Sequence, residues 1–256
     1  MGFLTDLTVT IRRELAERPL DLDALRAAAA LAPAPRSLAT ALRSRTPAII
    51  AEIKRSSPSA GAISSPDPRK QARAYTDAGA AAISVLTEPH HFHGSLEDLR
   101  AVREATDLPV LRKDFLVGVS QVVQARAAGA DAVLLITACL TDEELTAMLA
   151  AAREWGMDAL VETHSSVDLD RALATDAEIV GVNARDLETL EVDAGRALAQ
   201  LARIPAGRVA VMESGISTRA QVLAAVAAGA SGILVGEALM RAADPRAELR
   251  RLTGEE

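Results

Sequence analysis

The sequence predicts an α/β fold, a single (β/α)8 TIM barrel with an N-terminal helical extension. Its 256 residues match the roughly 250 that are typical of one such barrel. From about residue 48 onward, short apolar runs alternate with longer alanine-rich segments, a pattern typical of parallel strands joined by crossover helices. A short motif, AGA followed by an apolar run, also recurs at residues 78, 128 and 228.

Eight apolar runs are interpreted as strands, and eight is the number that closes this barrel. Each run is five or six residues long, which suits a strand better than a helix. In chain order the expected strands span residues 48–53, 81–86, 109–113, 131–136, 158–162, 178–183, 208–213 and 231–236.

The recurring AGA motif marks the ends of helices. Its copies are separated by 50 and then 100 residues, so two βα units fill each 50-residue step. Gly79, Gly129 and Gly229 are therefore expected to stop the first, third and seventh barrel helices. A doubly wound open sheet would alternate in the same way. The eight regular units, without a GxGxxG motif after the first strand, favour the barrel.

Residues 1–47 precede the first expected strand and form the predicted extension. The stretches TIRRELAERP and LDALRAAAALAP have helical spacing, and Pro33 and Pro35 follow as a break. No linker or low-complexity tract suggests a second domain. We therefore expect one domain overall, in which residues 1–47 pack on the barrel of residues 48–256 or cap its mouth.

Charge and composition exclude several classes of partner. The formal net charge is −7 and no dense Lys/Arg run occurs, so no nucleic-acid partner is expected. No stretch approaches the roughly 18 apolar residues of a membrane span, and no signal-peptide pattern begins the chain. The single Cys139 cannot form an internal disulfide, which fits a cytoplasmic location. The sequence leaves the oligomeric state open, with a monomer slightly favoured.

Polar residues stand where the expected strands end. In this fold catalytic groups project from the carboxyl ends of the strands, and alternate strand residues face the lumen. Any one of these residues alone can be an ordinary surface or ion-paired side chain. Together they bring two lysines and three carboxylates to one mouth, where a lysine can donate a proton and a glutamate can accept one. The residues are Glu52, Lys54, Lys113, Glu162, Asn183, Glu213 and Ser214.

Two glycines follow the last two strands. Gly215 in ESGIS and Gly236 in VGEALM lie in the loops where a barrel can bind phosphate through backbone N–H groups. Each glycine alone is better explained as a turn residue. The pair predicts a phosphate site between these two loops.

Two other motifs point less directly to chemistry. The segment PHHFHG holds His90, His91 and His93, but no carboxylate or cysteine accompanies them at metal-ligand spacing. A mobile loop at the mouth is therefore expected there, and no metal or other cofactor is predicted. Ser57 in RSSPS lacks the surroundings of a nucleophilic serine, so its hydroxyl is expected to contact a ligand.

Taken together, several segments resemble the signature of the indole-3-glycerol-phosphate synthase family. In the family's order from Ile49 to Arg241, they are AEIKRSSPSAG, VLTE with FHGS, LRKDF, GADAVLLI, LVETH, GVNARDLETLEVD, MESGI and LVGEALM. The resemblance implies a cofactor-independent carboxy-lyase of tryptophan biosynthesis. The implied substrate is a small phosphorylated anthranilate-sugar, 1-(2-carboxyphenylamino)-1-deoxyribulose 5-phosphate. It loses carbon dioxide and water as the pyrrole ring closes to give indole-3-glycerol phosphate.

The resemblance also implies catalytic roles. Lys113 would be the general acid that protonates the ketose carbonyl. Glu162 would accept a proton, or stabilise positive charge on the anilino nitrogen. Lys54, with Glu52 as its partner, would hold the anionic part of the substrate, and either lysine is a candidate for the acid of the dehydration step.

Further residues are implied in binding the substrate. Asn183 and Arg185 would orient it and bind Glu213 or the substrate carboxylate. The groups around the phosphate and sugar hydroxyls would be Ser57, Ser214, Gly215, Gly236 and the backbone of Glu237. An apolar wall against the anthranilate ring, which favours loss of a carboxylate, would consist of Leu86, Phe92, Phe115, Leu134 and Leu187.

The sequence departs from the family pattern at four positions, none of which removes a proposed catalytic group. Ala60 replaces a common lysine, and Ala184 replaces a common second asparagine. His91 replaces a common aromatic residue, and His93 replaces a common Gly or Asn. These departures leave turnover rate, loop closure and affinity open, and the extension matches the family only weakly.

Three other functions fit parts of the sequence. Phosphoribosylanthranilate isomerase, a related barrel, needs a cysteine at the end of the first strand, whereas Cys139 lies beyond the fourth. A Schiff-base aldolase also uses a barrel lysine, and borohydride would trap its adduct. A non-catalytic paralogue would be free to lose Lys113 or Glu162, both of which are present.

Overall fold

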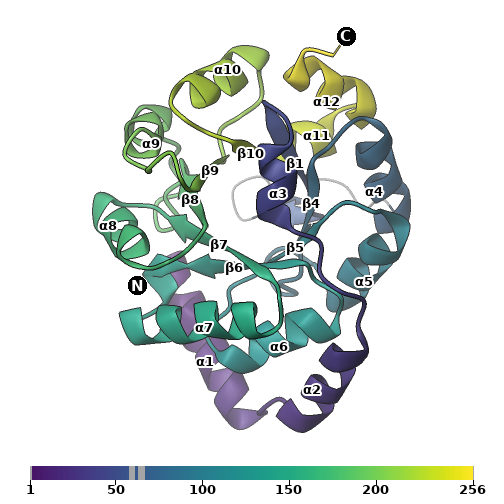
Figure 1. Cartoon of the computed structure of the whole chain (residues 1–256), viewed down its shortest axis with the longest axis vertical. Coiled ribbons are helices and arrows are strands. Elements are labelled where there is room, and N and C mark those ends of the chain that lie inside the picture. Colours follow the sequence, from purple (N-terminus) through teal and green to yellow (C-terminus); the bar gives the residue numbers. More distant parts are fainter. Residues whose placement is uncertain (1, 58–60, 63–66, 256) are drawn as a thin grey trace.

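Eight parallel strands close into a barrel at the centre of the computed structural model, which describes residues 2–57, 61–62 and 67–255. Strands that follow one another in the chain are neighbours, and β10 pairs with β1 to close the ring (Figure 1). This is the predicted (β/α)8 TIM barrel, and no strand end differs from its predicted position by more than one residue. The strands are β1 (Ala48–Ile53), β4 (Ala82–Leu86), β5 (Val110–Lys113), β6 (Ala132–Ile136), β7 (Asp158–Thr163), β8 (Ile179–Asn183), β9 (Val209–Glu213) and β10 (Gly232–Val235).

Helices surround the barrel. Gly79, Gly129 and Gly229 follow the first, third and seventh of these helices with φ angles of 87°, 91° and 102°, so they stop the helices as predicted. Several helices begin at a serine or threonine cap, such as Thr141 and Ser165. The helices are α4 (Pro68–Asp77), α5 (Leu96–Ala105), α6 (Val119–Ala127), the 3₁₀ turn η1 (Thr137–Cys139), α7 (Asp142–Glu154), α8 (Ser166–Ala174), α9 (Ala194–Leu201), α10 (Arg219–Ala227), α11 (Glu237–Arg241) and α12 (Pro245–Thr253).

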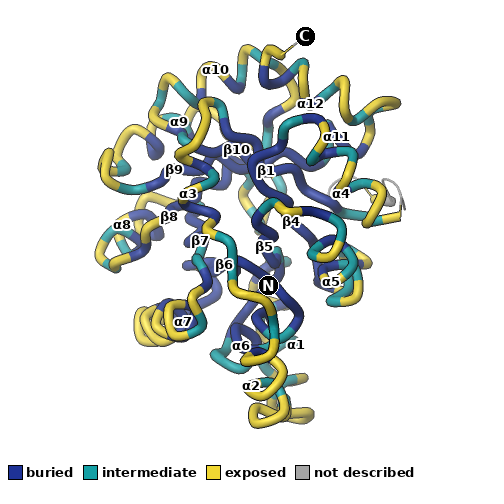
Figure 2. Tube along the Cα trace, turned by 45° about the vertical axis from the view of Figure 1, so that its right-hand side comes forward, coloured by how far each residue is buried: buried dark blue, intermediate teal, exposed yellow. Residues whose placement is uncertain are grey.

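The strands are buried on both faces, since one face meets the lumen and the other meets the helices. In Figure 2 they form the dark centre of the molecule, and exposed residues lie on the outer sides of the helices. Aliphatic side chains fill this core because aromatic residues make up only 2% of the chain. Near the carboxyl ends of their strands, the buried positions of Glu52, Glu162 and Glu213 interrupt the apolar pattern. That interruption places charge inside one mouth of the barrel.

The N-terminal segment forms three helices, α1 (Phe3–Glu17), α2 (Leu22–Leu31) and α3 (Leu38–Arg43). The first two match the predicted helical stretches, whereas α3 was not predicted. Leu38 and Leu42 of α3 are fully buried, and α3 contacts β1, β4 and β9 at the amino-terminal end of the barrel, where it lies across the centre in Figure 1. Helix α1 instead reaches the opposite mouth, because Phe3 lines the cavity there.

A short antiparallel pair, β2 (Ser56–Ser57) and β3 (Gly61–Ala62), follows β1 and was not predicted. Ala60 and the side chain of Ser57 lie outside the described part of the structure. Over the described residues, no helix combines the length and apolar character that crossing a membrane requires.

Candidate active site

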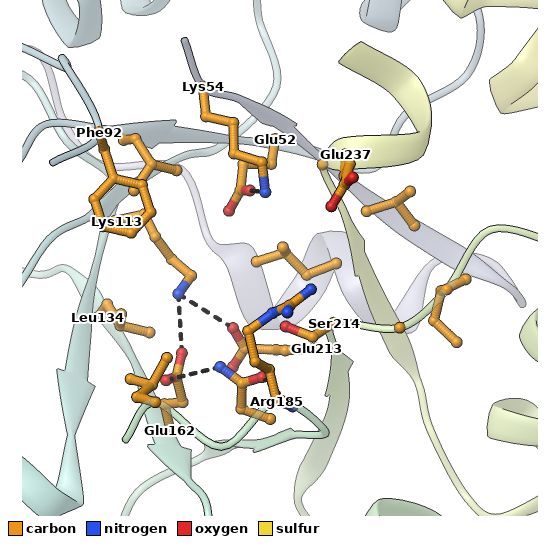
Figure 3. Close-up of a pocket in the computed structure, with 18 of the residues that line it drawn as sticks. Glu52, Lys54, Phe92, Lys113, Leu134, Glu162, Arg185, Glu213, Ser214 and Glu237 are labelled. Carbon is orange, nitrogen blue, oxygen red and sulfur yellow. Dashed lines mark hydrogen bonds and ion pairs between the residues drawn. The ribbon is translucent and has the colours of Figure 1, made fainter. Parts of the chain in front are cut away.

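A cavity of about 430 Å³ opens at the carboxyl ends of the barrel strands. Its lining combines charged groups with apolar side chains (Figure 3). Except for Ser57, every residue predicted to be catalytic or substrate-binding lines it. These residues are Glu52, Lys54, Leu86, Phe92, Lys113, Phe115, Leu134, Glu162, Asn183, Arg185, Leu187, Glu213, Ser214, Gly215, Gly236 and Glu237.

Lys113 stands at the end of β5 between two glutamates of the opposite strands. Its Nζ lies 2.9 Å from Glu162 Oε2 on β7 and 3.5 Å from Glu213 Oε2 on β9 (Figure 3). Burial alone would lower the Lys113 pKa, but the carboxylates of Glu162, Glu213 and Glu52 outweigh it and raise that pKa. Lys113 therefore carries its charge in the cavity.

The pKa values of the two glutamates beside Lys113 are shifted in opposite directions. Burial opposes the charge of both, but the ammonium of Lys113 keeps the Glu162 pKa well below its usual value. Burial and the neighbouring Glu162 charge raise the Glu213 pKa well above its usual value. The environment of two close carboxylates that share one cation moves their pKa values apart in this way.

Hydrogen bonds fix the Glu162 carboxylate from both sides. Lys113 Nζ donates to Oε2, and Asn183 Nδ2 donates to Oε1 at 3.1 Å. Asn183 is itself held, because its Oδ1 accepts a hydrogen bond from the backbone N–H of Arg185 at 3.0 Å. Such restraints hold a proton acceptor in one orientation, which favours catalysis.

A second ion pair lies at the end of β1. Lys54 Nζ is 2.9 Å from Glu52 Oε1, as expected for partners two residues apart on one face of a strand. Gly236 borders this pair closely: a Cβ at that position would lie 2.3 Å from Glu52 Oε1 and 3.0 Å from Lys54 Nζ. The absence of a side chain at Gly236 thus makes room for the ion pair.

The loops after β9 and β10 form a polar corner of the cavity. Ser214 and Gly215 both adopt the left-handed conformation, with φ angles of 66° and 73°, so the backbone turns sharply beside the cavity. At the start of α11, Glu237 Oε1 accepts a hydrogen bond from Arg241 Nε at 3.0 Å. Lys54 and Arg241 are the cationic side chains that line the cavity near these loops.

The apolar part of the cavity wall includes Phe3, which was not predicted. The ring centroid of Phe115 lies 6.1 Å from that of Phe92 and 6.4 Å from that of Phe3. Leu86, Leu134 and Leu187 complete the predicted wall. Phe3 belongs to α1, so the N-terminal extension contributes to the candidate site.

Arg185 does not bind Glu213, which corrects one of the two contacts expected for it. Its Nη1 donates instead to the carbonyl oxygen of Leu190 at 2.9 Å, while neither carboxylate oxygen of Glu213 has a hydrogen-bond partner among the described residues. The local reason is the turn at Leu190, whose φ of 63° brings that carbonyl to the guanidinium. Arg185 still lines the cavity.

Other lining residues were also missed. Several directly follow predicted ones, as Asp114 follows Lys113, so extending each strand end by a residue or two would have found them. Phe3 and Leu190 lie in segments where the sequence shows no strand end. The remaining missed residues are Ile136, Ile216, Ser217, Leu234, Val235, Ala238 and Arg241.

The histidine-rich loop after β4 is held by a buried glutamate. The Glu88 carboxylate accepts hydrogen bonds from the backbone N–H groups of His90, His91 and Phe92 at 2.7 to 2.9 Å. The loop thereby directs Phe92 into the cavity, and the ring of His91 packs edge-on against Phe3. In the described residues, no group of three or more His, Cys, Asp or Glu is arranged to hold a metal ion.

Comparison with known proteins shows which family the chain resembles over its length. A family model described as indole-3-glycerol phosphate synthase matches residues 5–252. The chain is 50% identical to an indole-3-glycerol phosphate synthase from Nocardioides sp., with 100% of both chains covered. It is 49% identical to the Micrococcus luteus protein of that name, covering 98% of this chain and 96% of the relative.

Solved structures share the fold at low sequence identity. A 3-hexulose-6-phosphate synthase superimposes with a TM-score of 0.64 at 20% identity, covering 81% of this chain and 98% of that one. This likeness supports the barrel fold alone. The family match over nearly the whole chain, together with relatives at about half identity, leads to one conclusion: the chain belongs to the indole-3-glycerol phosphate synthase family.

Proposed function

We propose that the protein closes the pyrrole ring of 1-(2-carboxyphenylamino)-1-deoxyribulose 5-phosphate, with loss of carbon dioxide and water, to give indole-3-glycerol phosphate for tryptophan biosynthesis. Two kinds of support carry the proposal. The relatives at 50% and 49% identity bear the name of this activity. The single structural observation that carries it is the Lys113–Glu162 pair, which places a charged acid and an ionised base in one cavity.

The first step forms a carbon–carbon bond. The ring carbon that bears the carboxylate attacks the ketose carbonyl, and Lys113 donates a proton to the carbonyl oxygen. The bond to the carboxylate then breaks, carbon dioxide leaves, and its electron pair restores the aromatic ring. An apolar wall favours this loss, because the carboxylate is poorly solvated there. Phe92, Phe115 and Leu134 supply such a surface.

The second step removes water. A lysine protonates the new hydroxyl group, which leaves as water, and Glu162 accepts the proton that the forming pyrrole ring releases. Lys54 and Lys113 are the two candidates for this donation, since both line the cavity. We propose Lys113 for the first donation because it contacts Glu162, and Lys54 for the second because it borders the loops where the phosphate would bind.

The polar corner would hold the phosphate. Ser214, Gly215 and the backbone of Gly236 and Glu237 offer hydrogen-bond donors there, and Lys54 adds positive charge. Asn183 and Arg185 would orient the substrate from β8, beside Glu162. Each proposed proton transfer uses a protein side chain, so we propose that the reaction needs no cofactor.

Steady-state fluorescence tests the proposal directly. The purified protein is mixed with the carboxyphenylamino substrate, and indole fluorescence is followed with and without a metal chelator. We expect fluorescence to grow at the same rate in both samples. A sample without fluorescence growth would overturn the proposed activity, and a rate abolished by the chelator would overturn cofactor independence. Borohydride added with a ketose phosphate is expected to leave the protein mass unchanged, whereas a Schiff-base aldolase would gain a covalent adduct.

A further inference from the structure

His164 is a largely buried side chain next to the proposed base, and both of its ring nitrogens are buried. It follows β7 directly and stands two residues after Glu162, so both side chains project toward the same mouth. The Nε2 atom lies 3.1 Å from Glu162 Oε1, and the His164 side chain is only 10% exposed. Among the described residues, neither ring nitrogen has a partner with hydrogen-bond geometry.

This placement is costly for folding. A buried polar atom without a hydrogen bond loses the water that it would bind in the unfolded chain. His164 has two such atoms, and an apolar side chain of similar size would avoid both losses. Unsatisfied polar groups of this kind occur at functional sites. The position of His164 therefore points to a role other than stabilising the barrel.

The imidazole faces the oxygen of Glu162 that Lys113 leaves free. Lys113 holds Oε2, whereas Oε1 receives Asn183 from one side and lies beside His164. When Lys113 donates its proton to a substrate, the positive charge on the Oε2 side is lost. Asn183 and His164 are then the described side chains that still contact the carboxylate.

His164 also lines a second cavity, here named the side cavity. It has a volume of about 360 Å³ and lies between α1, η1 and the loops after β7 and β8. Leu187 lines both cavities, and Glu162 lines only the catalytic one, so the His164 ring stands in the wall between them. The charged or titratable groups around the ring are Glu162, Asp168, Asp186, Glu188, Arg12 and, beyond Glu162, Lys113.

We propose that His164 is a positioning residue for Glu162. Its ring lies against Oε1 and limits how the carboxylate can turn, so that Glu162 stays directed at the substrate for proton acceptance. The inference rests on the function proposed above and adds a residue that positions its base.

The test compares His164→Gln and His164→Leu with wild type and with the control His93→Asn. His93 is exposed in the loop after β4, and its φ of 54° suits asparagine. The rate is followed by indole fluorescence. We expect His164→Leu to lower kcat roughly tenfold, part of the 10²- to 10⁴-fold that a general base contributes, and His164→Gln to recover some of it. KM should change little, because His164 does not line the catalytic cavity.

An unchanged kcat in His164→Leu, with only a lower melting temperature, would overturn the proposal. A loss of kcat in His164→Leu that His164→Gln does not reduce would also overturn it, because a polar side chain at this position should restore part of the contact with Glu162. A wild-type protein without any activity would instead refute the proposed function, so the two failures are distinguishable.

Discussion

The ammonium group of Lys113 lies 2.9 Å from the carboxylate of Glu162, so the proposed acid and base of the reaction are ion-paired in the free protein. The pair stabilises the charged form of each partner, which keeps Lys113 protonated and Glu162 ionised. Once Lys113 transfers its proton to a substrate, the Glu162 pKa is expected to rise. The base therefore strengthens at the stage when it has to accept a proton.

Replacement of Glu162 by glutamine tests the base. Glutamine keeps the size of the side chain, but its amide has one acceptor oxygen, so it replaces only one of the two oxygens that accept hydrogen bonds from Lys113 and Asn183. It also cannot accept a proton at neutral pH. We expect kcat to fall about 10²- to 10⁴-fold while KM changes much less. Indole fluorescence under steady-state conditions gives both values. Glu143→Gln, on the exposed start of α7, is the matched control, and a kcat within a few-fold of wild type in Glu162→Gln would exclude this role.

Glu213 gives a prediction about stability and pH. Its pKa is raised in the folded protein by burial and by the Glu162 charge. The proton is therefore held more tightly in the folded state, so the stabilising contribution is complete below the unfolded-state pKa and is lost as pH rises through the folded-state pKa. Glu213→Gln is expected to melt above wild type at pH 8, and the difference should shrink toward pH 5. Each kcal/mol corresponds to roughly 2–4 °C.

Differential scanning fluorimetry of Glu213→Gln and wild type at several pH values measures this difference. Glu143→Gln serves again as the control, because that side chain is exposed. A difference in melting temperature that grows as the pH falls would show the opposite linkage. It would mean that Glu213 is more acidic in the folded protein than in the unfolded chain.

Phe3 links the N-terminal extension to substrate binding. Its ring contacts those of His91 and Phe115, with centroids 5.1 and 6.4 Å away, and it lines the cavity. Each aromatic contact contributes about 0.5–1.5 kcal/mol, so Phe3→Ala is expected to raise KM about 5- to 10-fold and to leave kcat within a few-fold. Val9→Ala, at an exposed position of the same helix, is the control. Equal KM values for Phe3→Ala and Val9→Ala would count against the contact.

Replacement of Gly236 by alanine is predicted to lower kcat/KM by displacing the Glu52–Lys54 pair. An alanine Cβ there would lie 2.3 Å from Glu52 Oε1, and the buried carboxylate has to move to make room. We expect kcat/KM to fall roughly 10- to 100-fold, because small displacements of catalytic groups are costly. The melting temperature should change little, since the far end of a side chain moves rather than the backbone. Gly118→Ala is the control because nothing lies within 4 Å of its added Cβ, and similar kcat/KM values in both variants would contradict the prediction.

The barrel and its charged mouth could be predicted because both depend on short-range patterns. Alternation along a strand places Glu52 and Lys54 on one face, and strand ends in this fold meet at one mouth. The same spacing links Glu162 and His164, so the signal for His164 was present in LVETH although it was not used. Phe3 could not be predicted in this way, because its place in the cavity depends on how α1 packs across loops far away in the chain.

Irregular loops account for the remaining differences. The expected contact of Arg185 with Glu213 is replaced by one with the Leu190 carbonyl, whose position depends on a left-handed residue that is not glycine. Helix α3 is only six residues long and gives little helical periodicity, although Ser37 caps it. Local sequence patterns carry little information about either feature, since tertiary contacts decide both.

The steady-state rate of Lys113→Met, compared with that of Lys70→Met, shows whether Lys113 is the acid of the reaction. Both changes remove a lysine charge, but Lys113 contacts Glu162 inside the cavity, whereas Lys70 is exposed on α4. We expect Lys113→Met to lose at least about 10²-fold in kcat on the carboxyphenylamino substrate, whereas Lys70→Met should turn over at the wild-type rate. A folded Lys113→Met protein that produces indole fluorescence as fast as wild type would exclude Lys113 as the acid.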